Sequence, residues 1–389
     1  MSNSLKKQIK DWIRAKLIAY LKTHSLRLPI KKNKIVFDNF GGKGYGDNPK
    51  FVAEALLHSG KKLDLVWVLS DMDSPLPLGI RAVKWYSVKS FFEYATAKVW
   101  VDNIRNNIRP PKRRKQVYLQ TWHGPYGIKK SEGNAIQSLN KEYITAAKYD
   151  GSITDAIIAH SALQESAFQK GYWLNENVEI LRYGLPRNDV FFSDLYKQNV
   201  KQHLKTWGIN DGDYVILYAP TFRDDGSIDG YLYDFDELIE HFRLKFSKPC
   251  KVIVRMHPNA KKIKNMYNYS NVIIDGTEYP DFQHLALMAD ALVSDYSTAV
   301  MDFGIARKPV FLYAADLQKF IANGRIDSRI FTFPFLISYS INELIDQIDS
   351  FDLEKYQMKL DAYFFENPVY DDGHSSEHVA EWIIEKIGI

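Results

Sequence analysis

The chain of 389 residues contains a single cysteine, Cys250, and no long hydrophobic run. One cysteine excludes an intrachain disulfide framework and a cysteine-based zinc site. The apolar run Val252-Ile253-Val254 follows Cys250 closely, so we predict a buried structural thiol. No stretch approaches the roughly 20 apolar residues that a membrane-spanning helix needs. Since the N-terminus also lacks a signal-peptide pattern, we expect a cytoplasmic protein.

The overall composition sets further limits. The chain is 46% hydrophobic and 25% charged, as in ordinary globular proteins, which argues against disorder. Its net charge of +4 is a mild basic excess that suits anionic substrates and does not indicate a nucleic-acid partner. The length predicts two domains of fewer than about 200 residues each.

The first 34 residues carry ten lysines and arginines against one acidic residue, Asp11. Apolar residues recur there at helical spacing. This pattern predicts a basic amphipathic helix over 1–33 that lies on an anionic membrane surface, at the inner face of the cell membrane. A helix packed on the protein with a solvated basic face is the alternative. The basic cluster at 112–115 fits either anionic headgroups or a solvated loop. The helix-spaced apolar residues are Leu5, Ile9, Trp12, Ile13, Leu17, Tyr20 and Leu21.

Short apolar runs alternate with helical patterns along the rest of the chain. This alternation predicts an α/β fold with two doubly wound, mostly parallel sheets. We place the first domain at 34–200, the second at 201–375 and a C-terminal helix at 376–389. Predicted strands cover 34–38, 63–69, 99–101, 118–121, 156–160, 214–218, 251–256, 272–275, 291–294 and 309–313. Predicted helices cover 50–59, 88–97, 162–170, 298–306 and 375–389.

Polar residues gather where these strands end. In open α/β sheets ligands bind at the carboxyl ends of the strands, and a cleft between two domains is a favoured site. We therefore expect the site between the two domains.

His123 ends one such strand and meets Gly124, which predicts an imidazole in the cleft that acts as a general base on a hydroxyl. Lys129 and Lys130 follow and would attract phosphate. A structural histidine within a loop is the alternative.

A second histidine, His257, ends a strand in the other half of the chain. Alternation along that strand puts Arg255 and His257 on the same side, from which both could donate hydrogen bonds to a diphosphate. The alternative is a salt-bridged arginine beside a capped strand end.

Two further motifs in this half favour anion binding. Ser297 and Thr298 open a helix, where free backbone N–H groups and the helix dipole attract anions. Ordinary helix capping by Ser297 explains the same residues. Arg223 follows a strand end and offers a bidentate fork for phosphate, unless it pairs with Asp224 or Asp225 on the surface.

Two loops give weaker signals. The glycine-rich run 41–46, which includes Gly42, follows a strand and would let the backbone approach an acceptor, but it matches no standard nucleotide motif. The loop at 182–189 lies near the predicted domain crossing and fits a functional loop or a hinge equally well.

Six motifs in order resemble the CDP-glycerol glycerophosphotransferase family, the teichoic-acid primases and polymerases. The resemblance runs from about residue 35 to 375. The motifs are Asp47-Asn48-Pro49-Lys50, Gln120-Thr121-Trp122-His123-Gly124, Gly184-Leu185-Pro186-Arg187-Asn188-Asp189, Ala219-Pro220-Thr221-Phe222-Arg223-Asp224-Asp225, Arg255-Met256-His257-Pro258, and Ser294-Asp295-Tyr296-Ser297-Thr298 with Met301-Asp302-Phe303.

The resemblance implies a GT-B-type fold of two facing Rossmann-like domains. It implies transfer of glycerol phosphate, or a related alditol phosphate, from CDP-glycerol or CDP-ribitol with release of CMP. The first domain would take the acceptor and the second the donor, with His123 and His257 as catalytic residues. The donor-binding residues would be Thr221, Arg223, Arg255, Pro258, Asn259, Asp295, Ser297 and Thr298. The acceptor-side residues would be Gly42, Gly124, Lys129, Lys130 and Asn188.

The sequence departs from the family after Gly124. The family commonly continues with Thr-Pro-Leu-Lys-Lys, whereas this chain has Pro125-Tyr126-Gly127-Ile128 before Lys129 and Lys130. This loop is on the acceptor side, so the acceptor is the open question. The expected acceptor is a saccharide on a polyprenyl diphosphate lipid or a growing polymer, of teichoic acid or capsule type. The shorter length favours a primase, a short-chain enzyme or a capsule-polymer relative.

No carboxylate cluster suggests a dedicated metal cage, so we expect no tightly bound cofactor; a Mg²⁺ ion held loosely on the donor diphosphate fits the chemistry. Two alternative functions remain. One is a GT-B glycosyltransferase that uses a nucleotide sugar. The other is a non-catalytic module that binds anionic lipid.

Overall fold

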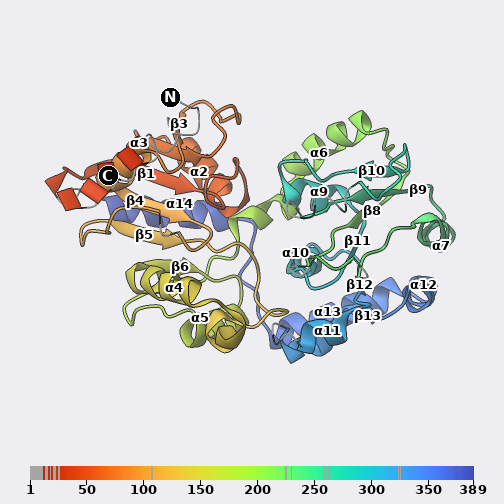
Figure 1. Ribbon diagram of the computed structural model, residues 1–389. Helices are drawn as coiled ribbons and strands as arrows, with labels where there is room; N and C mark the ends of the chain where they lie inside the picture. The colour runs from red at the N-terminus through yellow and green to blue at the C-terminus, as the bar shows by residue number, and fades with distance from the viewer. Residues whose placement is uncertain are drawn as a thin grey trace, which may run out of the picture.

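The computed structural model describes residues 12–389, except 14, 15, 18, 21, 22, 25, 26, 107, 224, 225, 229, 258, 259, 261, 262, 264, 323 and 325. These residues form two α/β domains, each built on a parallel sheet with helices on both faces (Figure 1). The predicted α/β class with two parallel sheets is therefore confirmed.

The first domain contains a seven-stranded sheet with the order β3-β2-β1-β4-β5-β6-β7. Its central strands are almost continuously apolar because helices cover both faces. Ile35 and Phe37 face α2 and the C-terminal helix α14, whereas Val36 faces α3. The strands are β1 (Lys31–Asp38), β2 (Asp64–Leu69), β3 (Ile80–Lys84), β4 (Ala97–Asp102), β5 (Val117–Gln120), β6 (Ala156–Ile158) and β7 (Glu179–Leu181). The helices are α2 (Asp47–His58), α3 (Val88–Thr96), α4 (Lys141–Ile153), α5 (Ala162–Gly171) and the short 3₁₀ segment η2 (Glu132–Ser138).

The second domain contains a six-stranded sheet with the order β10-β9-β8-β11-β12-β13. Its side chains form one continuous core, in which Cys250 is buried as predicted. The strands are β8 (Tyr214–Tyr218), β9 (Cys250–Val254), β10 (Ile273–Asp275), β11 (Ala291–Ser294), β12 (Val310–Tyr313) and β13 (Leu336–Ser338). The helices are α6 (Asp194–Thr206), α7 (Asp236–Phe246), α9 (Phe282–Met288), α10 (Ala299–Ile305), α11 (Leu317–Ala322), α12 (Ile341–Asp349) and α13 (Leu353–Glu366).

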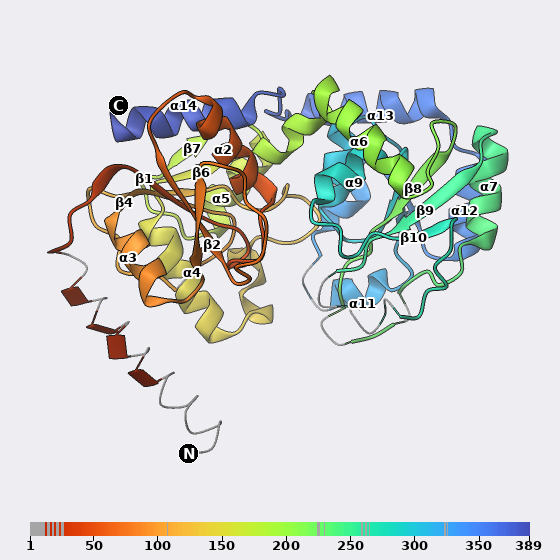
Figure 2. The ribbon, with the colours of Figure 1, turned by 90° about the horizontal axis from the view of Figure 1, so that it is seen from above.

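The chain passes between the domains twice. The first passage is the 3₁₀ segment η3 (Pro186–Phe191), after which α6 packs on α9 of the second domain. The second follows α13 and leads to α14 (Ser375–Ile387), which packs on α2 of the first domain. Figure 2 shows α13 and α14 following one another along one edge of the molecule.

Two of the expected boundaries need correction. The predicted break at residue 200 falls inside α6, because Val200 and its neighbours bury their apolar side chains in the second core. The C-terminal helix at 376–389 is not a separate unit, because Val379, Trp382 and Ile383 complete the core of the first domain.

The predicted amphipathic helix over 1–33 lies largely outside the described residues. Within 12–24, eight described residues have helical backbone, and all eight are exposed. Among them Trp12 and Tyr20 are 63% and 59% exposed, so these two side chains do not pack on either domain. In the part of the chain that the structure describes, no helix is both long and apolar enough to cross a membrane.

Candidate active site

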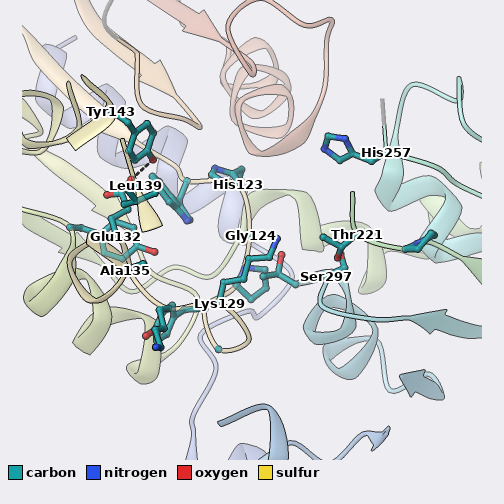
Figure 3. A pocket seen from close by; sticks show the side chains of 18 residues that line it. His123, Gly124, Lys129, Glu132, Ala135, Leu139, Tyr143, Thr221, His257 and Ser297 are labelled. Carbon is teal, nitrogen blue, oxygen red and sulfur yellow. Dashed lines mark hydrogen bonds between the residues drawn. The ribbon is translucent and has the colours of Figure 1, made fainter. Parts of the chain in front are cut away.

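A cavity of about 390 Å³ opens between the carboxyl ends of the two sheets. Figure 3 shows His123 and His257 on opposite sides of it. Both domains contribute to the lining, as expected for a site at an inter-domain cleft. Residues of the first domain that line it include Trp122, His123, Gly124, Lys129 and Lys130, and those of the second include Pro220, Thr221, His257, Ser297 and Thr298.

His123 stands just beyond β5, on a turn with a specific backbone geometry. Its neighbour Trp122 has a positive φ of 55°, and the side chain of Gln120 accepts a hydrogen bond from the Trp122 N–H at 2.9 Å. The imidazole packs beside the Trp122 ring, with 4.6 Å between ring centroids, and edge-on to Phe40. The sequence places the histidine at a strand end, and this turn directs it into the cleft.

The tautomer of neutral His123 follows from one hydrogen bond. Nδ1 lies 2.7 Å from the main-chain carbonyl oxygen of Asn103, at the end of β4. A carbonyl oxygen only accepts, so Nδ1 carries the proton and donates it. Nε2 is then the ring nitrogen that can take up a proton, which is the arrangement that a general base requires.

The environment of His123 also favours its neutral form. Burial lowers the pKa of His123 from the ordinary value of 6.5, because the charged imidazolium loses hydration. The hydrogen bond to Asn103 and the charge of Asp47 raise this pKa, while Arg187 and Lys129 lower it further. The net result is a histidine that is neutral, and able to act as a base, at neutral pH.

The peptide groups around His123 are held by side chains from three other elements. Asn48 lies on α2, Gln164 on α5 and Arg187 on η3, the passage between the domains. They donate to successive carbonyl oxygens: Asn48 to Trp122 at 3.0 Å, Arg187 to His123 at 2.9 Å and Gln164 to Gly124 at 2.9 Å.

Gly124 marks the point where the first domain comes closest to α10. A Cβ atom at this position would lie 2.6 Å from Oγ1 of Thr298, which is too close for two non-bonded atoms. Glycine therefore allows the His123 turn to approach the residues that open α10.

The unusual loop after Gly124 crosses to the second domain. Ile128 is fully buried in the second core, and its carbonyl oxygen accepts from Asp327 N–H at 2.8 Å. Lys129 forms an isolated antiparallel bridge with Ile326. Gly127, with a φ of +154°, lies against the ring of Phe333. We call residues 125–130 the strap, because they tie the first-domain wall of the cavity to the second domain.

The opposite wall consists of His257, Thr221 and the residues at the start of α10. His257 is exposed to the cavity beyond β9 and stacks on Phe222, with 5.6 Å between ring centroids. The hydroxyl of Thr221 is buried and has no hydrogen-bond partner within the described structure. Ser297 Oγ accepts from Ala299 N–H at 3.3 Å and lines the cavity; the N-cap residue of α10 is Thr298, whose side chain makes no capping hydrogen bond. These groups give the second wall donors for an anionic ligand.

Two predicted donor-binding residues lie beneath this wall and do not line the cavity. Arg223 is 1% exposed and forms ion pairs with Asp295 and, through Nε at 2.9 Å, with Asp316. Asp295 in turn accepts from Thr221 N–H at 2.8 Å. The Arg223–Asp295 pair thus fixes the turn that carries Thr221. The guanidinium of Arg223 is bonded to protein groups, and neither residue lines the cavity. The alternative, a surface pairing of Arg223 with Asp224 or Asp225, concerns two residues outside the described part.

Arg255, Asn188 and Gly42 also lie outside the cavity lining. The guanidinium of Arg255 donates to the main-chain carbonyls of Gly276, Thr277 and Tyr279, so it holds the loop after β10. Asn188 is fully buried and bonded to Asp371 and Gln283. Gly42 packs against Ser70 and Trp85. Pro258 and Asn259 are outside the described residues.

Sequence reasoning missed a group of residues at the far end of the cavity, on η2 and α4. Glu132 accepts from the hydroxyl of Tyr143 and pairs with Arg105, whose guanidinium lies 5.3 Å from the ring of Trp122. Glu132 and Tyr143 line the cavity, together with Leu139 (Figure 3). The 3₁₀ segment η2 is short and is broken at Ala135, and its residues have no hydrophobic periodicity, so no pattern in the sequence marks it.

The described residues include no group of three or more histidine, cysteine, aspartate or glutamate side chains that could hold a metal ion.

Comparison with known proteins agrees with this geometry. The family model for CDP-glycerol:poly(glycerophosphate) glycerophosphotransferase matches residues 20–385. The chain belongs to this family.

Individual members of the family also match most of this chain. A teichoic acid poly(glycerol phosphate) polymerase of Staphylococcus epidermidis is 28% identical over 377 residues, which cover 92% of this chain and 51% of the relative. The chain thus spans about half the length of that polymerase. A teichoic acid glycerol-phosphate transferase of Staphylococcus aureus is 31% identical over 329 residues, covering 81% of this chain and 82% of the relative.

A solved structure is similar across nearly the whole chain. The structure of a variant of the wall teichoic acid polymerase TagF, soaked with CDPG, matches with a TM-score of 0.84 and 26% identity. The match covers 98% of this family member and 97% of that chain. The two-domain arrangement is therefore a TagF-like GT-B fold.

Proposed function

We propose that this protein transfers glycerol phosphate, or a related alditol phosphate, from a CDP-activated donor to a hydroxyl of an acceptor, with release of CMP. The observation that carries the proposal is His123, whose Nδ1–H is fixed on the Asn103 carbonyl and whose Nε2 is left to act as a base. It stands opposite a wall of hydrogen-bond donors in the same cavity (Figure 3). Family membership supports the substrate class.

The donor would lie against the second domain. His257, the unpartnered Thr221 hydroxyl and Ser297 line this wall and are suited to hydrogen bonds with diphosphate oxygens. Such groups stabilise a transition state best when they are fixed before the substrate arrives. The buried Arg223–Asp295 pair supplies this rigidity by fixing the turn that carries Thr221.

The acceptor hydroxyl would enter from the first domain, past Lys129 and Lys130. Nε2 of His123 takes the hydroxyl proton as the oxygen attacks the phosphorus that carries the alditol. The bond from that phosphorus to the bridging oxygen of the diphosphate breaks, and CMP leaves with the bridging oxygen. In this type of reaction, catalysis consists mainly of positioning and charge stabilisation. We propose no resident metal; a Mg²⁺ ion brought in on the diphosphate is compatible with the scheme.

The acceptor and the location are also proposals. We propose a hydroxyl on a polyprenyl-linked saccharide or on a growing teichoic acid or capsule-type polymer. Such an acceptor lies at the membrane, and the exposed Trp12 and Tyr20 in a basic segment support a peripheral protein on its inner face. Co-sedimentation with anionic liposomes, compared between the full chain and a protein lacking residues 1–30, tests this location.

The deciding experiment is product analysis by mass spectrometry. The protein is incubated with CDP-glycerol, CDP-ribitol or nucleotide sugars and candidate lipid-linked acceptors. We expect CMP release and alditol phosphate on the acceptor. Transfer from a nucleotide sugar alone would favour the glycosyltransferase, and binding to anionic lipid without any transfer would favour the non-catalytic module.

Substitution of the base gives the matched test. His123→Ala should lower turnover about 100-fold or more, the usual range for a general base. His374→Ala is the control, because His374 is exposed on the surface and pairs with Glu377. Equal activity of the two variants would contradict the proposed role of His123.

A further inference from the structure

We propose that Arg187 is the positioning residue that holds His123 in register with the donor wall of the second domain. The inference rests on the proposed transfer reaction and adds to it the means by which two domains present one site. Arg187 does not line the cavity, so it acts through other groups and does not contact substrate.

The position of Arg187 in the fold is the first argument. It lies on η3, where the chain passes from the first domain to the second, and is only 6% exposed. Its backbone N–H donates to the side chain of Asn48 on α2 at 3.1 Å. The same Asn48 side chain donates to the carbonyl of Trp122. The backbone of η3 is therefore connected to the residue that precedes His123.

The contacts of the guanidinium are the second argument. Nη1 donates to the carbonyl oxygen of His123 and to Asp47 on α2, both at 2.9 Å. Nη2 donates to Asp302 on α10 at 2.8 Å. Asp302 comes one helical turn after Thr298, which lines the cavity. One rigid, planar group thus links the turn that carries the base to the helix that carries a donor-wall residue.

The electrostatics of this cluster make the link difficult to replace. Asp302 is fully buried, and its burial raises its pKa, which the charge of Arg187 opposes. A neutral residue at 187 would leave the buried Asp302, and Asp47 on α2, without the cation that both contact. The link therefore depends on the charge as well as on the fork geometry, and the two can be separated by substitution.

The charged groups that act on His123 are Asp47 from α2, Arg187 from η3 and Lys129 from the strap. Arg187 lowers the pKa of His123, so its removal should raise that pKa. A merely structural arginine elsewhere in the core would not move this titration. Arg187→Lys keeps the charge and loses the fork, whereas Arg187→Gln loses both.

The experiment combines kinetics with titration. For Arg187→Lys we expect kcat to fall about 10-fold to 100-fold, as for a misplaced reacting group. The Kd for CDP-glycerol should stay nearly unchanged. The acid limb of the pH–rate profile, where the rate falls at low pH, should stay near its native pH. For Arg187→Gln we expect a similar or larger loss and an acid limb at higher pH. Asp302→Asn should lower kcat without moving the acid limb.

Arg182→Gln is the matched control. Arg182 lies five residues earlier, is exposed and pairs with Glu165, so its substitution should leave kcat and the acid limb at native values. Thermal unfolding of all variants identifies those that fold. If Arg187→Gln does not fold, Arg187→Lys and Asp302→Asn still test the link. A kcat within about threefold of native in these two folded variants would overturn the proposal.

Titration of ¹⁵N-labelled histidines by NMR separates this proposal from the proposed function. The His123 signal is assigned by its loss in His123→Gln. If the native protein transfers nothing from CDP-glycerol, the proposed function is refuted. The titration of His123 would still test the contact between Arg187 and the His123 turn. An unchanged pKa of His123 in folded Arg187→Gln would overturn the positioning role.

Discussion

The Nδ1–H of His123 donates to the main-chain carbonyl of Asn103 over 2.7 Å, so a side chain just beyond β5 is oriented by the residue that follows the adjacent strand β4. The acceptor is a backbone atom, and the side chain of Asn103 fixes that backbone. Its Oδ1 accepts from Phe40 N–H at 2.9 Å and its Nδ2 donates to Asn39 at 2.8 Å. The orientation of the His123 imidazole thus depends on residues at the ends of three neighbouring strands, β1, β4 and β5.

The activity should depend on pH through His123. Burial lowers its pKa below the ordinary 6.5, and the proposed base must be neutral, so kcat/KM should stay on a plateau at pH 7 and fall only below pH 6.5. The same shift means that the unfolded chain binds the proton more tightly. The free energy of unfolding should therefore decrease as the pH falls from 6.5 toward the lowered pKa. A pH–rate profile with its acid limb above 6.5 would contradict this.

Thr221→Val tests the unpartnered hydroxyl in the cavity. The substitution keeps the volume and removes a buried polar group that has no partner in the described structure, so it should not lower the melting temperature. If the hydroxyl binds the donor, KM for CDP-glycerol should rise about 5-fold to 10-fold, equivalent to one hydrogen bond. Thr221→Ser, which keeps the hydroxyl, is the control. An unchanged KM in the valine variant would show that the donor does not use this group.

Gly124→Ala tests the contact between the base-bearing turn and α10. The new Cβ would lie 2.6 Å from Oγ1 of Thr298, and such overpacking costs about 1–3 kcal/mol. We expect a lower melting temperature and a lower kcat, because the two walls must move apart. Adding Thr298→Ala should restore stability. Gly212→Ala is the control, because its Cβ would meet open space, and equal melting temperatures for the two single variants would contradict the close approach.

The strap should contribute to the stability of the second domain although it belongs to the first. Ile128→Ala removes a fully buried side chain from the second core and should lower the free energy of unfolding by about 2–5 kcal/mol. Ile136→Ala, on a side chain that is 45% exposed, should change it far less. Denaturant unfolding measures both. A loss of less than about 1 kcal/mol for Ile128→Ala would mean that the strap is not anchored as described.

Much of the fold could be predicted from the sequence, because the buried parallel strands are short, nearly continuous apolar runs. All ten predicted strands are present, and β8 and β11 have the predicted boundaries. The three strands that were not predicted, β3, β7 and β13, each lie at an edge of their sheet. Edge strands are less buried, as the exposed residue in β7 illustrates, and so their pattern is weaker.

The position of a residue in the cavity was predictable where a strand end carries the residue directly, as for His123 and His257. It was not predictable where a polar residue has a choice of partners. Arg223 and Arg255 follow strand ends as a phosphate ligand would, yet each is bonded to groups of the protein that come from distant segments. Arg187 shows the reverse case: its loop gave equal support to a function and a hinge, and its contacts with both domains appear only in three dimensions.

The return of α14 to the first domain determines the order in which the chain can fold. Residues 194–366 form an insertion within the first domain, whose core stays incomplete until Val379, Trp382 and Ile383 have been synthesised. During translation the second domain can therefore close first, even though its sequence comes later than most of the first. A nascent chain halted before α14 would expose the apolar surface of α2 and β1 and would be a target for chaperones.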